Sequence, residues 1–252
     1  MQQSLKHAVR GTVDGMLGAV GLIRTKLTAF SDYRDYIPFE ETIAGANAAN
    51  LPVGDYIDAK HNQPGITRAT VDQIAELGVF AGAIDRVCEI GPGSGRYLAQ
   101  TLQRCKPSHY EIYETAPKWR EWLAAQYQVI SRTTDGSSLA ETPSGSIDLA
   151  HAHKVFPGQP SLVMARYFAE MARVTRAGGH VVFDTVTEAC LDDAALERWH
   201  TTGRGYQHYP CLMPKQFTIE FFARRGLRFV GSFLAPMEPG STEIMVFRRE
   251  QA

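Results

Sequence analysis

The stretch that decides the fold is residues 87–95, which read Val-Cys-Glu-Ile-Gly-Pro-Gly-Ser-Gly. A short apolar run of this kind predicts a buried strand, and the three glycines predict a sharp turn that a ligand can approach closely. Residues 96–105 follow with helical periodicity, so the free N–H groups of a helix start would face the same turn. The stretch therefore predicts a strand, a ligand-binding turn and a helix.

The spacing of the glycines narrows the kind of ligand. A dinucleotide-binding turn places its glycines as G-x-G-x-x-G. Here the third glycine, Gly95, comes one residue early and Arg96 stands in its place, while Glu89 precedes the first glycine by two positions. The spacing argues against a nicotinamide-dependent oxidoreductase, which stays open as an alternative because it would share the fold class.

Strands and helices alternate through most of the chain, in segments expected at 86–90, 95–105, 109–113, 117–126, 128–132, 137–141, 147–152, 161–174 and 180–186. Such alternation predicts a mostly parallel sheet with helices on both faces. Helices at 191–199 and 215–225 and strands at 227–235 and 241–248 complete the pattern. The prolines and glycine between the last two strands indicate an antiparallel hairpin.

Residues 1–62 fall outside this alternation. Residues 11–30 suit a loosely amphipathic helix that its glycines weaken, and residues 43–51 suit a second short helix or an ordered loop. We expect residues 1–62 to form an N-terminal helical cap and residues 63–252 to form the α/β domain. A partly disordered leader is the alternative for the first segment.

The composition excludes several classes of protein. A net charge of -1 gives no excess of cations for binding nucleic acid. No apolar segment approaches the ~20 residues that a membrane span needs, and the glycine-broken N-terminus does not suit a secretion signal. The four cysteines lack metal-binding spacing. We expect a cytoplasmic protein with reduced thiols, and a homo-oligomer stays open.

With Glu89 and its three glycines, the turn resembles the first motif of class I S-adenosylmethionine (SAM) methyltransferases, E/D-x-G-x-G-x-G. Further segments continue the resemblance in the order of the family, at Glu114 and at residues 133–136, 146–151 and 173–184. The resemblance implies a Rossmann-like class I methyltransferase sheet with an antiparallel C-terminal hairpin. It also implies SAM as the cofactor and methyl transfer as the reaction.

The same resemblance implies which residues hold the cofactor. In that family the glycines let the methionine part of SAM pass the backbone. An acidic residue at the place of Glu114 accepts hydrogen bonds from both ribose hydroxyls, and an Asp and its neighbour, at the place of Asp135 and Gly136, border the adenine. The expected cofactor residues are Glu89, Gly91, Gly93, Gly95, Glu114, Asp135 and Gly136. Glu89 could instead brace the backbone of the turn, and Glu114 could be a solvated strand end.

The expected fourth strand ends in His151-Ala152-His153-Lys154. Ligands of an open parallel sheet lie beyond the carboxyl ends of its strands, and side chains two residues apart share one face. Histidine titrates near neutral pH and suits removal of a proton from a hydroxyl nucleophile. We predict His153 as the catalytic base, with His151 as the alternate base or a substrate contact.

Two segments are dense in aromatic and hydrogen-bonding side chains, residues 55–61 and residues 203–210. They are candidates for binding the acceptor of the methyl group, a small molecule or an oligosaccharide. Aromatic rings beside polar groups suit a sugar, and loops of this kind commonly carry function. The predicted substrate residues are Tyr56, His61, Lys154, Tyr206, His208 and Tyr209. A lid that packs on itself is the alternative.

The second half of the chain resembles bacterial sugar O-methyltransferases, through residues 152–158, residues 220–226 and the terminal Pro-Gly-Ser-Thr. Among them, the likeness is to enzymes that methylate the reducing-end hydroxyl in methylmannose polysaccharide synthesis. A methyltransferase for a phenol, an amine or a polyketide and a non-enzymatic SAM-binding protein stay open.

A divalent metal such as Mg²⁺ is used by some sugar methyltransferases, which hold it with carboxylates. In this chain, His153, Asp184 and residues 192–193 could meet at one end of the sheet. The expected fourth strand lacks the run of Asp that would support such a site, so no residue is predicted as a metal ligand.

Overall fold

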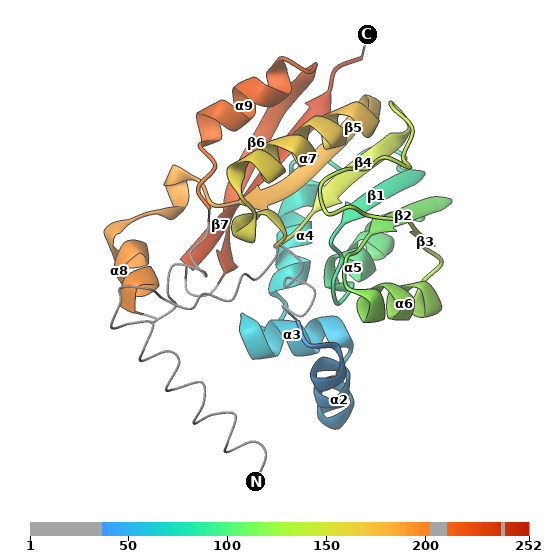
Figure 1. Cartoon of the computed structure of the whole chain (residues 1–252), viewed down its shortest axis with the longest axis vertical. Coiled ribbons are helices and arrows are strands. Elements are labelled where there is room, and N and C mark those ends of the chain that lie inside the picture. The colour runs from blue at the N-terminus through green and yellow to red at the C-terminus, as the bar shows by residue number, and fades with distance from the viewer. Residues whose placement is uncertain (1–36, 202–210, 238–239, 252) are drawn as a thin grey trace, which may run out of the picture. The chain divides into compact units, whose positions relative to one another are not determined.

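The computed structural model describes residues 37–201, 211–237 and 240–251 (Figure 1). The helix expected at 11–30 lies outside the described residues. The described helices are α2 (Phe39–Ala49), α3 (Val53–His61), α4 (Ile66–Glu76), α5 (Arg96–Arg104), α6 (Pro117–Gln126), α7 (Ser161–Val174), α8 (Asp193–Thr201) and α9 (Lys215–Ala223). None of them is long and apolar enough to cross a membrane.

A seven-stranded sheet organises the fold. Its strands are β1 (Arg86–Ile90), β2 (His109–Tyr113), β3 (Ile130–Ser131), β4 (Ile147–Ala152), β5 (Thr175–Thr185), β6 (Leu227–Met237) and β7 (Gly240–Arg249). They follow the order β3-β2-β1-β4-β5-β7-β6. β1 to β5 pair in parallel, whereas β7 runs antiparallel to both β5 and β6. The expected parallel sheet with an antiparallel C-terminal hairpin is confirmed.

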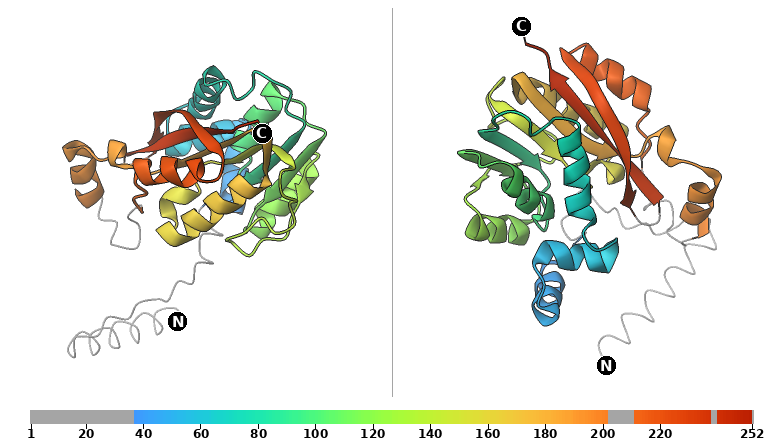
Figure 2. Two further views of the ribbon diagram at one scale, coloured as in Figure 1. Left: turned by 90° about the horizontal axis from the view of Figure 1, so that it is seen from above. Right: turned by 180° about the vertical axis from the view of Figure 1, so that it is seen from behind.

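Helices cover both faces of this sheet (Figure 2). Leu149 of β4 packs with apolar residues of α4, α5 and α6, while its neighbour Ala150 packs with those of α7 and α9. The second layer is rich in aromatic rings, such as Phe168 stacked on Phe183 at 4.4 Å between ring centroids. Aromatic pairs of this kind contribute about 0.5–1.5 kcal/mol each beyond the area that they bury.

Two segments differ from the sequence-based prediction. The helix expected at 137–141 is absent, because the Asp135 carboxylate accepts hydrogen bonds from the N–H groups of Ser137 and Ser138 and so forms a local turn. β5 begins at Thr175 rather than at residue 180. Its glycines do not end the strand, because they lie where the register with β4 shifts in a bulge.

Helices α2 and α3 occupy the part of the expected cap that the structure describes. The Arg96 guanidinium, at the start of α5, pairs with the Asp58 carboxylate of α3 at 2.9 Å. Asp58 is buried and also accepts hydrogen bonds from the Thr67 backbone N–H and hydroxyl. This buried ion pair connects α3 to α5, the helix that follows the glycine turn. The domain boundary at residue 62 stays a prediction.

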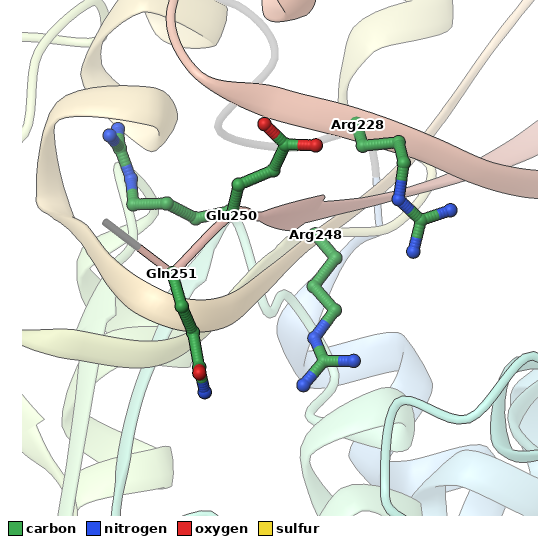
Figure 3. A pocket seen from close by; sticks show the side chains of 5 residues that line it. Arg228, Arg248, Glu250 and Gln251 are labelled. Carbon is green, nitrogen blue, oxygen red and sulfur yellow. The ribbon is translucent and has the colours of Figure 1, made fainter.

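The C-terminal end of the hairpin carries a shallow pocket of about 280 Å³ (Figure 3). Its lining residues are Arg228, Arg248, Arg249, Glu250 and Gln251. The pocket lies four or more register positions from Asp184 of β5, since Arg248 pairs with His180 and Ile244 pairs with Asp184. It is therefore separate from the edge where the parallel strands end.

Candidate active site

The carboxyl ends of β1, β2, β4 and β5 bring the predicted site residues to one edge of the sheet (Figure 1). β1 leads into the glycine turn, residues 91–95, and β2 leads into Glu114. β4 leads into His153, and Asp184 is the next-to-last residue of β5. Parallel pairing explains this convergence, because strands that run in one direction end at one edge.

The glycine turn needs glycine for conformation and for space. Gly91, Gly93 and Gly95 have φ of 60°, 51° and 72°, in the left-handed region that residues with a Cβ rarely adopt. A Cβ at Gly91 would lie 2.7 Å from Val155 Cγ2, and one at Gly95 would lie 2.5 Å from Leu123 Cδ2. Glycine at these two positions therefore lets the turn pack directly on Val155 and Leu123.

Glu114 braces this turn. Its Oε2 accepts a hydrogen bond from the Gly93 N–H and its Oε1 accepts one from the Ala116 N–H, both at 2.8 Å. The carboxyl group is buried, and burial raises its pKa against the opposing effect of the Ala116 and Gly93 N–H groups. The interpretation of Glu114 as a solvated strand end is wrong.

Glu89 is buried in the layer beneath the turn. Its Oε2 accepts a hydrogen bond from the Tyr110 hydroxyl at 2.6 Å, and that hydroxyl lies 3.0 Å from His151 Nε2. Burial raises the pKa of Glu89 to about 8, so its carboxyl group is protonated at neutral pH. Glu89 therefore supports the turn through the core, and the role of bracing its backbone belongs to Glu114.

His151 belongs to the same buried network. It is paired in register with Glu89 and is 1% exposed. Burial, helped by the neighbouring His153, lowers its pKa well below the usual value, so it is neutral at physiological pH. Of the two histidines, His151 lies deeper in the core and His153 lies one step nearer the edge.

His153 combines a neutral ring with an unpaired ring nitrogen. Its imidazole stacks on the Tyr97 ring at 4.1 Å between centroids, with 17° between the planes. Burial, together with the Lys154 and Arg96 charges, lowers its pKa to about 3, so this ring does not titrate near neutral pH, contrary to the prediction from the sequence. Its Nδ1 is buried and has no hydrogen-bond partner.

Buried polar atoms without partners are concentrated at this edge. In the part of the chain that the structure describes there are three such side-chain atoms, Ser94 Oγ, His153 Nδ1 and Arg249 Nε. Two of them lie in the glycine turn and at the end of β4. An unpaired buried polar group costs about 1–3 kcal/mol, and a bound ligand with polar groups would remove that cost here.

Asp135 and Gly136, expected beside the adenine, lie in a turn after β3. The Asp135 carboxylate is exposed and accepts hydrogen bonds from the Ser137 and Ser138 N–H groups at 2.8 and 2.7 Å. Gly136 has φ of 76°. The structure thus uses the Asp135 side chain to shape this turn.

The residues predicted to bind the acceptor lie in different parts of the structure. Tyr56 and His61 lie on α3, where the Tyr56 ring packs against Gly45 of α2. The Lys154 side chain is buried and bonded to Thr242 and Asp184. Tyr206, His208 and Tyr209 lie outside the described residues.

Sequence reasoning missed Trp119, at the start of α6. Its Nε1–H donates to the Ile37 carbonyl oxygen at 2.8 Å, and its ring meets the Phe39 ring edge-on at 4.9 Å. Ile37 Cδ1 lies 3.8 Å from where a Cβ on Gly93 would be. The strap formed by residues 37–39 therefore lies against the glycine turn. An indole five residues after the strand-end acid was the signal in the sequence.

The described residues do not supply a set of ligands for a metal ion. Among residues 37–201, 211–237 and 240–251, no three His, Cys, Asp or Glu side chains gather in a way that could hold an ion. The Asp184 carboxylate is bonded to Lys154 and Thr242, and the Asp192 carboxylate accepts from the Ala195 N–H.

Comparisons with known proteins give a family match and a likeness of fold. A family model described as a methyltransferase domain matches residues 55–231. A search of curated protein sequences finds no match. Solved structures supply a likeness of fold.

Magnesium protoporphyrin IX methyltransferase (ChlM) from Synechocystis PCC 6803, solved with bound S-adenosylhomocysteine (SAH), superposes with a TM-score of 0.58 and 12% identity over 78% of this chain and 86% of that one. The N-methyltransferase NodS from Bradyrhizobium japonicum WM9 superposes with a TM-score of 0.54 and 16% identity, over 74% of this chain and 97% of that one. An S-adenosylmethionine-dependent methyltransferase from Mesorhizobium loti superposes with a TM-score of 0.52 and 16% identity, over 69% of this chain and 96% of that one. At these identities the likeness establishes the fold.

Proposed function

We propose, from the premise that this chain belongs to the methyltransferase domain family, that it transfers the methyl group of SAM to a hydroxyl group of a sugar. The chain is a SAM-dependent methyltransferase by its family and its fold. The acceptor and the roles of individual residues form the proposal.

The edge residues suit SAM. At Gly93 the nearest atom to a Cβ would be Ile37 Cδ1 at 3.8 Å, so the backbone there would leave room for the methionine part. The Glu114 carboxylate would exchange its bond to the Gly93 N–H for bonds from the ribose hydroxyls. The Ser94 hydroxyl is buried without a partner in the same turn and would meet a polar group of the cofactor. When bound, SAM supplies an electrophilic methyl group.

The observation that carries the hydroxyl acceptor is the free Nδ1 of His153. This atom is buried on a neutral imidazole beyond the end of β4. A hydroxyl nucleophile must lose its proton during methyl transfer, whereas a neutral amine attacks with its own lone pair. His153 Nδ1 would accept the hydrogen bond of the hydroxyl and then its proton.

The sugar is supported by the residues on the acceptor side. Tyr56 and His61 of α3 and the sequence positions Tyr206, His208 and Tyr209 combine rings with hydrogen-bonding groups. Rings stack on the C–H faces of a sugar while polar groups bind its hydroxyls. The resemblance of the second half of the chain to sugar O-methyltransferases favours the same acceptor.

An acceptor panel tests the proposal. We would measure SAH release with SAM and matched sets of hexosides, phenols and amines, for the wild type and for His153→Gln. The expected result is turnover of hexosides, a loss of kcat of about 100-fold or more in the variant, and unchanged affinity for SAH. Turnover of amines alone, or full activity of His153→Gln, would overturn the acceptor or the base while leaving the family membership intact.

His180→Gln is the matched control. His180 is a partly buried histidine of β5, paired in register with Arg248 at the far end of the hairpin. Burial and the Arg248 charge lower its pKa to about 4, so it resembles His153 in charge state but not in place. This control variant is expected to keep wild-type turnover.

A further inference from the structure

The residue after His153 has an unusual backbone. Lys154 has φ of 59°, and only one other non-glycine residue in the described chain, Asn50, has a positive φ. The left-handed conformation costs a residue with a long side chain about 1–2 kcal/mol, and it persists only where the surroundings hold it. Such a conformation beside a candidate base calls for a physical cause.

Two residues from neighbouring strands, Asp184 of β5 and Thr242 of β7, supply that cause. The Asp184 carboxylate accepts a hydrogen bond from the Lys154 N–H at 2.6 Å and lies 3.1 Å from Lys154 Nζ. Lys154 Nζ also donates to the Thr242 hydroxyl at 2.6 Å, and that hydroxyl donates to Asp184 Oδ2 at 2.6 Å. We call Lys154, Asp184 and Thr242 the Lys154 clamp.

The clamp is almost closed to solvent. Asp184 and Thr242 are fully buried, and the Lys154 side chain is 13% exposed. Burial lowers the pKa of Lys154, while the Asp184 carboxylate raises it and so favours the charged pair. The ammonium group is therefore committed to this internal network and is not presented to an acceptor.

The turn at Lys154 joins two parts of the active site. Before it, His153 stacks on Tyr97 at the start of α5. After it, Val155 packs so closely on Gly91 that its Cγ2 would lie 2.7 Å from a Cβ there. The left-handed turn thus sets where the imidazole stands relative to the glycine turn.

We propose that the Lys154 clamp is a positioning device that holds the His153 imidazole in register with the glycine turn. The proposal rests on the proposed function of His153 as the base. Methyl transfer needs the nucleophile, the methyl group and the sulfur in line, and a displacement of about 1 Å can cost about 100-fold in rate. Lys154 is a positioning residue on this account, and the earlier expectation that it contacts the acceptor is replaced.

The test compares Thr242→Val with Thr242→Ser. Valine keeps the volume and removes the hydroxyl, whereas serine keeps the hydroxyl. The readout that needs no acceptor is the NMR spectrum of the ring nitrogens of the eight histidines, with His153 assigned by the signal that His153→Gln removes. We expect Thr242→Val to move the His153 signals and Thr242→Ser to restore them, while both variants keep the wild-type affinity for SAH.

Once the acceptor panel has identified a substrate, Thr242→Val should lower kcat by about 10- to 100-fold without raising KM for SAM. Thr242→Ser should recover most of the lost activity. Unmoved His153 signals in Thr242→Val would overturn the proposal. An equal loss in both variants would also overturn it, because the hydroxyl would then not be the cause. The NMR readout separates this failure from a failure of His153 as the base, which only His153→Gln measures.

Lys154→Gly and Lys154→Met separate the backbone from the charge. Glycine relieves the left-handed strain and methionine keeps it, and both remove the ammonium group. The charged groups facing His153 are Lys154 and Arg96, each paired with a buried carboxylate, Asp184 and Asp58; Tyr97 and His151 face it uncharged. Both variants should raise the pKa of His153 and lower the melting midpoint, because each leaves the Asp184 carboxylate buried without its ammonium partner. The loss should be smaller in Lys154→Gly, because glycine also relieves the left-handed strain.

Discussion

The backbone N–H of Gly93 donates a 2.8 Å hydrogen bond to Oε2 of Glu114, which joins the glycine turn after β1 to the acid that ends β2. The second carboxylate oxygen is bound to the Ala116 N–H at the same distance. The two oxygens thus hold the turn and the start of α6 together. The Glu114 carboxylate therefore shapes the turn, and on the proposed function it also binds the ribose.

Glu114→Gln should weaken both functions. The amide group offers one acceptor where two N–H donors point, so one buried N–H loses its partner at a cost of about 1–3 kcal/mol. We expect a lower melting midpoint and at least a tenfold loss of SAH affinity, measured by thermal unfolding with and without SAH. Glu121→Gln, on the exposed face of α6, is the control and should match the wild type in both.

Trp119→Phe tests the strap of residues 37–39. The phenyl ring can keep its edge contact with Phe39 but cannot donate to the Ile37 carbonyl oxygen. We expect a loss of about 1 kcal/mol of stability and faster cleavage near residue 37 by a nonspecific protease. If SAH protects the wild type and not the variant, the strap covers the cofactor; equal protection would refute that role.

The regular core of the fold was predictable because periodic apolar runs report directly on burial. The bounds of β1, β2, β4, α6 and α7 agree with the expected ranges. The errors fall where side chains compete with backbone pairing. Asp135 replaces an expected helix with a turn, and residues 178–179 lie in a bulge where glycines suggested that no strand could run.

The candidate site was predictable in position and less so in chemistry. The glycine turn, Glu114 and His153 converge as the parallel strands imply. The partners of these residues lie far away in sequence, as with Trp119 and Ile37, or Lys154 and Thr242. Periodicity carries no information about such pairs, so the bracing of the turn by Glu114 and the clamp at Lys154 required the structure.

Glu89 should make stability depend on pH. Its pKa rises from the model-peptide value of 4.5 to about 8 because the group is buried. A group whose pKa is raised in the folded state stabilises fully below its unfolded pKa and loses that contribution as pH rises toward the folded pKa. Between pH 4.5 and 8, this term should therefore fall by about 1.4 kcal/mol per pH unit.

Glu89→Gln isolates that term, because the amide does not titrate and its oxygen can still accept from the Tyr110 hydroxyl. Urea unfolding at pH 5.5 and pH 8 should show that the stability of the wild type relative to this variant decreases with rising pH. His151 and His153, whose lowered pKa values make the protein lose stability as pH falls below about 6.5, act equally in both proteins. A difference independent of pH would mean that Glu89 is ionised in the fold.

Arg228 and Arg248 should repel each other across the C-terminal hairpin. They are paired in register on β6 and β7, are both exposed, and extend toward the same side (Figure 3). Within the described residues neither has an ion pair with a carboxylate, and their side chains donate hydrogen bonds to backbone oxygens, of Phe229 at 3.5 Å and Gly178 at 3.4 Å. Like charges directly opposite on neighbouring strands destabilise a sheet.

Arg228→Glu and Arg248→Glu should therefore each raise the free energy of unfolding by about 0.2–1 kcal/mol at low salt. The double reversal should return to the wild-type value, because it replaces two positive charges with two negative ones. Urea unfolding in 0.02 M and 0.5 M sodium chloride measures the effect, and screening should remove most of the gain at the higher concentration. If the single reversals lower stability and salt leaves that loss unchanged, these arginines stabilise the hairpin through packing of their stems rather than oppose each other through charge.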